Sequence, residues 1–291
     1  MAPSVARLPG NDQTSVMSST VLGLVRASHP EPTTAVTAVT ALLAAGVGHS
    51  PGGIAVVSLT VAASQFAVGW TNDLLDADRD ALVGRTDKPV AAGMVGRRTV
   101  AVAAVLAGGA TVTLALTTNP VAALWAVLGL LSALLYDWPL KSTSISVLPY
   151  AVSFGALPAF VVSALPGAPL PPAWLVAAAA MLGAGAHFAN VLPDFVDDAR
   201  TGVHGLPHRL GSAGSRVAGA GLLIAATVTL VLGPPGPPSG VGLAAIAAAV
   251  VIPALAWYAD RAGTRPVAAF RAAMLVALID VVLLVASGRL V

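Results

Sequence analysis

The sequence predicts an all-α integral membrane protein with nine transmembrane helices, and three observations support this fold class. First, 56% of the 291 residues are hydrophobic and 10% are charged, whereas soluble domains carry about 25% charged residues. Second, the mean hydropathy is +0.84. Third, the apolar residues lie in long runs, and an α-helix needs roughly 20 such residues to cross about 30 Å of hydrocarbon. The lipid bilayer is therefore the expected environment.

Each predicted span is an apolar run bounded by a charged cluster or by glycine and proline. The division between the third and fourth spans depends only on the short segment TTNP. The nine runs cover about residues 33–48, 53–74, 98–117, 119–136, 144–165, 172–193, 213–232, 240–259 and 267–288.

The basic residues orient these spans. If the N-terminus is cytoplasmic, every lysine and arginine except Arg289 falls in a cytoplasmic segment or at the inner end of a helix. This distribution follows the positive-inside rule and predicts a bacterial-type cell membrane with a cytoplasmic N-terminus. Residues 1–25 are expected to form a disordered cytoplasmic tail, and residues 26–291 a single transmembrane domain.

Two features of the composition exclude classes of function. The formal charge of +2 is too small to indicate nucleic-acid binding. The chain has no cysteine, which excludes disulfides and thiolate chemistry.

The scarce acids gather in two places, and the first is NDLLDADRD, residues 72–80. At about 100° per residue, Asn72, Asp76 and Asp80 lie within an arc of about 80° on one helix face. Asp78 lies on the opposite face, where we expect it to meet water or a neighbouring basic residue. The segment is therefore predicted to present a carboxylate face at the cytoplasmic end of the second span.

The second cluster, NVLPDFVDD, repeats the same pattern at the cytoplasmic end of the sixth span, with Asn190, Asp194 and Asp198. The two nine-residue windows together hold seven of the 13 acids. Two carboxylate faces brought together would repel each other unless divalent cations lay between them. Oxygen ligands of this kind favour Mg²⁺ or Ca²⁺, and Mg²⁺ commonly bridges carboxylates to substrate phosphates. The alternative is a solvated acidic loop.

Basic and aromatic residues that could hold an anion follow the even-numbered spans. Each of them singly could serve only to orient the protein in the membrane. Together with the carboxylates they are typical of a magnesium-diphosphate cradle at a membrane surface. These residues are Arg85, Lys88, Tyr136, Lys141, Arg200 and Arg209.

The chain resembles the UbiA superfamily of intramembrane prenyltransferases. The resemblance is carried by NDLLDADRD with the following RTDKPVAAG, by YDWPLK from Tyr136 to Lys141, and by NVLPDFVDDARTG with GLP downstream. Arg26 also looks like the family's N-terminal arginine. The paired motifs and the nine spans together cover nearly the whole chain.

The resemblance implies a nine-helix bundle around a central cavity, with a cytoplasmic cap formed by the loops after helices 2 and 6. It also implies that Mg²⁺ binds a prenyl diphosphate and assists its ionisation, and that an acceptor captures the allylic cation. Arg26, Lys88 and Lys141 would hold diphosphate oxygens near Tyr136, and Asp194 could accept a proton from the acceptor. The implied metal ligands are Asn72, Asp76, Asp80, Asn190, Asp194 and Asp198.

The sequence departs from the family pattern in two places. Asp87, Lys88 and Pro89 stand where many members have Asn-Arg-Pro, and a lysine makes point-charge contacts where arginine makes bidentate ones. Pro193 lies inside the second motif, where it should break or kink the sixth helix and so position Asp194.

Further polar and small residues have two interpretations each. Gln65 and Gly69 on the second span, and Gly183 and His187 on the sixth, could line a substrate pocket beneath the metals or could serve close helix packing. Asp280, in the ninth span, is either functional or a protonated packing residue.

The leading interpretation is a Mg²⁺-dependent prenyltransferase, a transferase of alkyl groups other than methyl, that acts on a prenyl diphosphate and a small aromatic or quinone-precursor acceptor. One alternative keeps this fold but lets the cation close on its own chain, as in a membrane terpene cyclase. Another is a cation-coupled transporter. The two motifs are predicted to open on the same side of the membrane, whereas many transporters have inverted repeats.

Overall fold

The computed structural model describes residues 10–260 and 267–287, and within these residues every regular element is a helix. The long helices are α1 (Gly10–Ala27), α2 (Pro30–Gly46), α3 (Pro51–Leu82), α4 (Arg97–Leu116), α5 (Pro120–Asp137), α6 (Val147–Ser163), α7 (Ala173–Val191), α9 (Leu206–Leu232), α10 (Gly240–Asp260) and α11 (Val267–Ser287). Short elements are η1 (Leu140–Ser142), η2 (Leu192–Asp194) and α8 (Phe195–Arg200). The predicted all-α class is confirmed.

Six helices in the described residues are long and apolar enough to cross a membrane, namely α3, α4, α5, α9, α10 and the run from α7 through α8. The helix α6 is also apolar but has 17 residues. Each of the nine predicted spans overlaps one long helix, from α2 to α7 and from α9 to α11. The crossing of the membrane by all nine remains a prediction.

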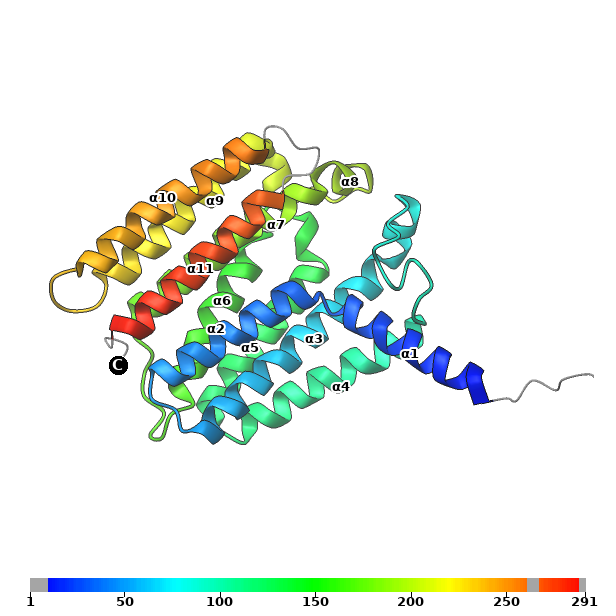
Figure 1. Ribbon diagram of the computed structural model, residues 1–291, viewed down its shortest axis with the longest axis horizontal. Helices are drawn as coiled ribbons and strands as arrows, with labels where there is room; N and C mark the ends of the chain where they lie inside the picture. Colours follow the sequence, from blue (N-terminus) through cyan, green and yellow to red (C-terminus); the bar gives the residue numbers. More distant parts are fainter. Residues whose placement is uncertain (1–9, 261–266, 288–291) are drawn as a thin grey trace, which may run out of the picture.

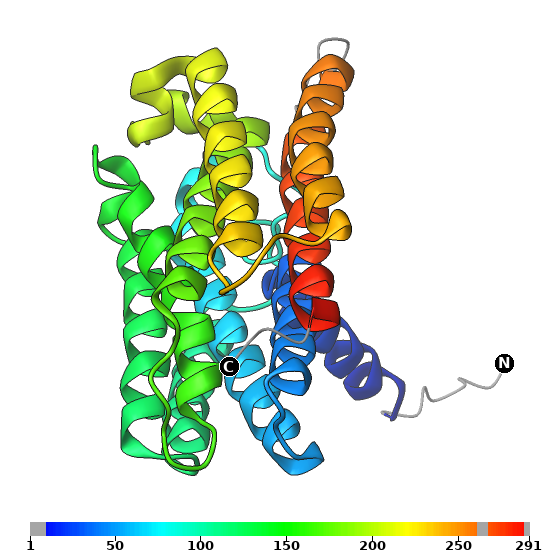
Figure 2. The same cartoon turned by 90° about the vertical axis from the view of Figure 1, so that its left-hand side faces the viewer.

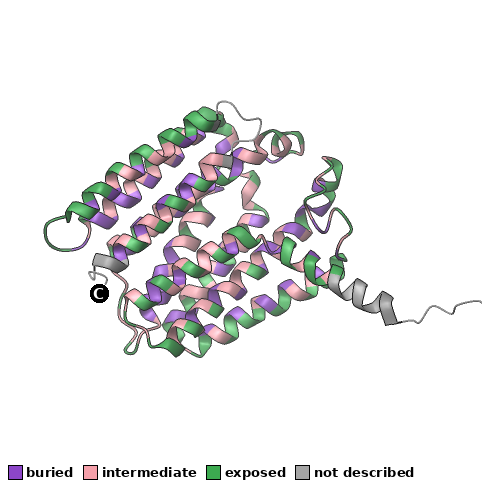
Figure 3. Cartoon of the chain, in the orientation of Figure 1, coloured by how far each residue is buried: buried purple, intermediate pink, exposed green. Residues whose placement is uncertain are grey.

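Apart from α1, which points away from the others, the long helices form one bundle whose axes run in broadly the same direction (Figures 1 and 2). Helices adjacent in sequence pack against each other, and α11 also contacts both α2 and α7. The last helix, α11, therefore packs beside α2, which is near the start of the chain. Buried residues lie mainly between the helices, while large apolar side chains face outward on α3, α4, α5 and α10, as the lipid-facing surface of a membrane protein requires (Figure 3).

The helix α3 extends beyond the predicted second span and contains the whole of NDLLDADRD. It begins at Pro51, after Ser50 whose hydroxyl accepts a hydrogen bond from the backbone N–H of Gly53 at 3.2 Å. Because the helix is unbroken through Leu82, the spacing of four residues places Asn72, Asp76 and Asp80 along one side.

The sixth predicted helix breaks where Pro193 predicts it. The α-helix α7 ends at Val191, residues 192–194 form the 3₁₀ turn η2, and α8 then begins at Phe195. A proline cannot donate the backbone hydrogen bond that would continue α7. The second acidic motif is therefore divided among α7, η2 and α8, whereas the first lies on one helix.

The N-terminal segment contains a helix where a disordered tail was expected. Residues 10–27 form α1, and its C-terminal end packs on α3. The indole N–H of Trp70 donates to the carbonyl of Leu24 at 2.8 Å. A Cβ at Gly69 would lie 2.8 Å from the carbonyl oxygen of Ser28. Gly69 thus lets the α1–α2 junction approach α3 closely, which agrees with the packing interpretation of this glycine.

Gly183 has the same packing role, and its replacement should be costly. A Cβ there would lie 2.5 Å from Cβ of Phe154 and 2.7 Å from the carbonyl oxygen of Tyr150. We expect Gly183→Ala to destabilise the protein by about 1–3 kcal/mol through overpacking, measured by thermal unfolding in detergent. Gly108→Ala is the matched control, because no atom lies within 4 Å of its added Cβ. Equal stability of the two variants would contradict this packing role.

Candidate active site

The ends of α3, α5 and α7 surround a polar cavity of about 430 Å³, which also borders the α1–α2 junction and the loop after α3. Both acidic motifs contribute to it, as does the YDWPLK segment. Of the residues predicted for the site, the cavity is lined by Arg26, Asn72, Asp76, Asp80, Arg85, Lys88, Tyr136, Lys141, Asn190, Asp194 and Asp198. Residues as far apart in the sequence as Arg26 and Asp198 thus meet at one end of the bundle.

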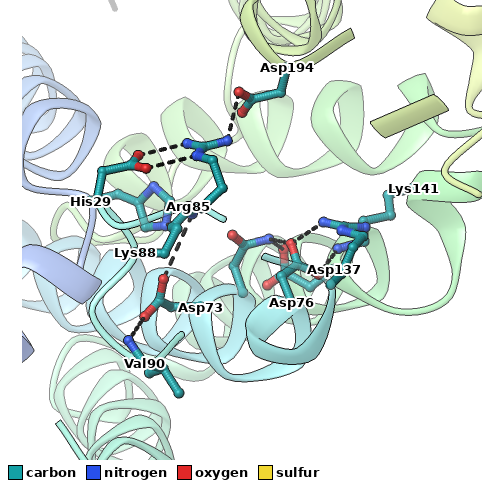
Figure 4. A network of polar contacts seen from close by, with 12 residues as sticks. His29, Asp73, Asp76, Arg85, Lys88, Val90, Asp137, Lys141 and Asp194 are labelled. Atoms are coloured by element: carbon teal, nitrogen blue, oxygen red, sulfur yellow. Dashed lines mark hydrogen bonds and ion pairs between the residues drawn. The ribbon is translucent and has the colours of Figure 1, made fainter. Parts of the chain in front are cut away.

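Asp76 is the central acid of the first motif. Its carboxylate pairs with the ammonium of Lys141, and Arg79 approaches Oδ2 at 2.6 Å. The amide nitrogen of Asn72 donates to the same Oδ2 at 3.3 Å. Asp76 and Lys141 therefore lie in direct contact although they come from different helical segments (Figure 4). Asp80 is also buried, and within the described residues its Oδ2 has no hydrogen-bond partner.

Arg85 connects the loop after α3 to the second motif. Its Nη1 lies 2.8 Å from Oδ1 of Asp194, while Nε and Nη2 bind the two oxygens of Asp87 at 2.8 Å each (Figure 4). The hydrogen bonds from Arg85 lower the pKa of Asp87 to about 2. The same pair raises the pKa of the guanidinium. This fork of three charge-assisted bonds joins the two motif-bearing segments across the cavity.

Asp73 serves the loop and not the cavity. It is 1% exposed, and its Oδ2 accepts a hydrogen bond from the backbone N–H of Val90 at 3.1 Å. Its other oxygen lies 3.8 Å from Nζ of Lys88 (Figure 4). The buried carboxylate thus anchors the segment that carries Arg85 and Lys88, which explains how an irregular loop can present both cations to the cavity.

Four predicted site residues do not line this cavity, namely Gln65, His187, Arg200 and Arg209. Gln65 lines a separate cavity of about 60 Å³ among α3, α4, α5 and α6. His187 is fully buried, with Nε2 at 3.0 Å from the hydroxyl of Ser146. The side chain of Arg200 is 72% exposed and lies 3.7 Å from Asp197. Helical phase placed the first two on the motif faces, but their depth in the bundle separates them from the cavity.

Two acids outside these groups have local partners. Asp78 binds Arg97 at the surface, with 3.1 Å between Oδ2 and Nη1, as its position on the opposite face predicted. Asp280 is buried and accepts a hydrogen bond from the hydroxyl of Thr227 at 3.1 Å. This contact agrees with the packing interpretation of Asp280, which does not line the polar cavity.

The structure adds residues to the site that the sequence did not single out. Arg79, His29 and His208 line the cavity, and Asp137 accepts a hydrogen bond from Asn72, which also lines it. The position of Arg79 could have been predicted from its spacing, because it lies about one helical turn after Asp76. The position of His29 could not, because it depends on the left-handed conformation of its backbone (φ 53°) at the start of α2.

The donor set fits Mg²⁺ by its chemistry. All six predicted ligands are carboxylates or amides, they line one cavity, and the unpartnered Oδ2 of Asp80 is a buried acceptor that a cation would satisfy. Within the described ranges, no three acids or histidines are gathered closely enough to hold a metal. The reason is visible in the contacts, since basic side chains hold Asp76 and Asp194.

The protonation of His29 should affect stability below neutral pH. Burial, and then the charge of Lys88, lower its pKa from 6.5 to about 4, and its Nε2 lies 3.4 Å from Nζ of Lys88. Because the unfolded chain binds this proton more readily, the contribution to stability is complete above pH 6.5 and is lost as the pH falls towards about 4. His29→Asn tolerates the left-handed backbone without titrating.

We therefore expect thermal unfolding midpoints to fall more for the wild type than for His29→Asn between about pH 7 and about pH 5. The acids that titrate in both proteins contribute equally to both pH dependences, so their effect cancels in this comparison. An equal fall in both proteins would contradict the expectation.

Comparisons with known proteins agree with this geometry. Residues 33–279 match the UbiA prenyltransferase family. No curated protein matches the sequence significantly.

Solved structures share the fold. A UbiA homologue from Archaeoglobus fulgidus bound to GPP and Mg²⁺ has 15% identity and a TM-score of 0.68, over 91% of this chain and 98% of that chain. The apo structure of a UbiA homologue from Aeropyrum pernix K1 has 20% identity and a TM-score of 0.69, over 89% and 96%. A digeranylgeranylglyceryl phosphate synthase has 17% identity and a TM-score of 0.65, over 93% and 98%. Because the family match extends over most of the sequence, the chain belongs to the UbiA prenyltransferase family.

Proposed function

We propose that the protein is a Mg²⁺-dependent intramembrane enzyme that transfers a prenyl group from a prenyl diphosphate to a small aromatic or quinone-precursor acceptor. The observation that carries this proposal is the joint lining of one cavity by both acidic motifs and by Arg26, Lys88 and Lys141. Structural neighbours bound to GPP or DMAPP with Mg²⁺ support the same class of substrate.

The basic and the acidic residues of the cavity have different proposed roles. In the proposed complex, Arg26, Lys88 and Lys141 would hold diphosphate oxygens. The motif acids and asparagines would hold Mg²⁺, which would supply positive charge against the leaving diphosphate. The C–O bond of the prenyl diphosphate breaks with both electrons remaining on the diphosphate oxygen. Lys141, which now holds Asp76, would turn to the substrate.

The acceptor then forms a bond to the allylic carbon and loses a proton. We assign this proton to Asp194, whose Oδ1 is held by Arg85 at 2.8 Å, which leaves Oδ2 to receive it. The ring of Tyr136 lines the cavity and packs edge-on against Tyr150, with 4.8 Å between centroids. Its face can stabilise the cation, and the apolar bundle below excludes water that would otherwise capture it.

The orientation in the membrane belongs to the same proposal. The cavity lies at the end of the bundle that carries most lysines and arginines, so the positive-inside rule places it at the cytoplasmic surface. The loop after α3 and the segment after α7 then form the cytoplasmic cap, and nine helices cross the membrane. The prenyl chain extends from the polar cavity towards hydrocarbon.

Turnover of prenyl diphosphates by the purified protein tests this function. We expect diphosphate release and a prenylated product, identified by mass spectrometry, only when Mg²⁺ and an aromatic acceptor are both supplied. Removal of Mg²⁺ with EDTA should stop both. A cyclic hydrocarbon formed from the diphosphate alone would establish the terpene-cyclase alternative. Ion flux in proteoliposomes without any product would support a transporter and contradict the proposal.

A further inference from the structure

Asp137, the last residue of α5, is a buried acid outside both acidic motifs. It is 3% exposed and lies beside Asp76 of the first motif (Figure 4). Its Oδ1 accepts a hydrogen bond from Nδ2 of Asn72 at 3.1 Å. Its Oδ2 is also buried and has no hydrogen-bond partner among the described residues.

The contact decides which way the Asn72 amide faces. Nδ2 donates to Oδ1 of Asp137 at 3.1 Å and to Oδ2 of Asp76 at 3.3 Å, so each of its two hydrogens has a carboxylate acceptor. The reversed amide would place its carbonyl oxygen against these two acid side chains, an arrangement that repulsion from the Asp76 carboxylate disfavours. The carbonyl Oδ1 of Asn72 is therefore left as the side-chain atom that can bind a cation.

A buried carboxylate of this kind is costly to the fold. An acid removed from water with an unpartnered oxygen destabilises the folded state, because neither hydrogen bonds nor an ion pair fully replace the lost hydration. Asp137 contacts the amide of Asn72 and forms no salt bridge with the part of the chain that the structure describes. A residue that costs stability and contacts a ligand of the site is expected to serve the site.

We propose that Asp137 is a positioning residue that fixes the Asn72 amide with its carbonyl towards the cavity and thereby sets the affinity for Mg²⁺. This inference rests on the proposed function, because it takes Asn72 as a metal ligand. Groups that orient metal ligands change affinity by about 10–100-fold when they are removed. The relevant property of Asp137 is the oxygen that accepts from Asn72, so an isosteric amide should replace it.

Magnesium titration of three variants tests the inference. The readout is the thermal unfolding midpoint of the full chain in detergent with inorganic diphosphate, measured against Mg²⁺ concentration. For Asp137→Ala we expect an unchanged or higher midpoint without Mg²⁺, and about a 10–100-fold higher Mg²⁺ concentration for half-maximal stabilisation. Asp137→Asn should remain within about threefold of the wild type, because its carbonyl still accepts from Asn72.

The third variant, Ser132→Ala, controls for the loss of a buried hydrogen bond on the same helix. Ser132 donates to the carbonyl of Pro149 at 3.0 Å, away from the cavity lining, so its removal should leave the Mg²⁺ requirement unchanged. In turnover assays, Asp137→Ala should lose activity at limiting Mg²⁺ and recover most of it at saturating Mg²⁺.

Several outcomes would overturn the inference. An unchanged Mg²⁺ requirement in Asp137→Ala would do so, and an Asp137→Asn variant as defective as Asp137→Ala would show that the charge, not the hydrogen bond, is what matters. If the proposed function itself were wrong, the results would differ from these. Mg²⁺ would then have no effect on the wild type, or Asp76→Ala would respond to Mg²⁺ as the wild type does.

Discussion

Replacement of Asp76 by alanine is expected to reduce kcat/KM for prenyl transfer by roughly 10³-fold while the protein stays folded. The carboxylate of Asp76 is the point at which the first motif meets both Lys141 and Arg79. Its loss removes a proposed metal ligand and leaves two cations without their acid. Diphosphate release by the purified variant measures the effect.

Asp194→Ala should have an effect of similar size, because it removes the corresponding acid of the second motif and the partner of Arg85. The matched control for both variants is Asp78→Ala. Asp78 lies two positions from Asp76 on the same helix, but its side chain is 83% exposed and binds Arg97 away from the cavity. Mg²⁺-dependent activity retained in both Asp76→Ala and Asp194→Ala would refute the assignment of the site.

Replacement of Lys141 by methionine is the change with the second-largest expected effect. The lysine reaches Asp76 from the segment after α5, and its side chain is 13% exposed. Methionine keeps the apolar stem and removes the charge that the leaving diphosphate would meet. We expect kcat/KM to fall by about 10²–10³-fold, mainly in kcat, because the stabilised charge develops in the transition state.

Two comparisons sharpen the Lys141 experiment. Arg97→Met removes a basic side chain near the same end of the bundle that does not line the cavity, and its activity should stay within about twofold of the wild type. Lys141→Arg keeps the charge, but a planar guanidinium does not fit a site built for an ammonium, so only partial activity should return. A Lys141→Met variant as active as Arg97→Met would remove Lys141 from the mechanism.

The positions of the helices, and the face of α3 on which the first motif lies, could be predicted from the sequence alone. Hydropathy and the run lengths located a long helix at each predicted span, because an apolar segment of this length has few other stable structures in a bilayer. Helical periodicity separated Asp76 and Asp80, which line the cavity, from Asp78, which binds Arg97 at the surface. The break after Val191 followed from Pro193, because the loss of one backbone donor is a local effect.

Which residues contact one another in the site depends on how the helices pack and could not be predicted from the sequence. Periodicity gives the angle of a residue around its own helix, but neither its depth in the bundle nor its neighbour on the next helix. For this reason Gln65 and His187 share the motif faces without reaching the cavity, and Arg85 reaches Asp194 across 109 positions. The bond between Asp137 and Asn72 is of the same kind, since it exists only because α5 ends beside the acidic face of α3.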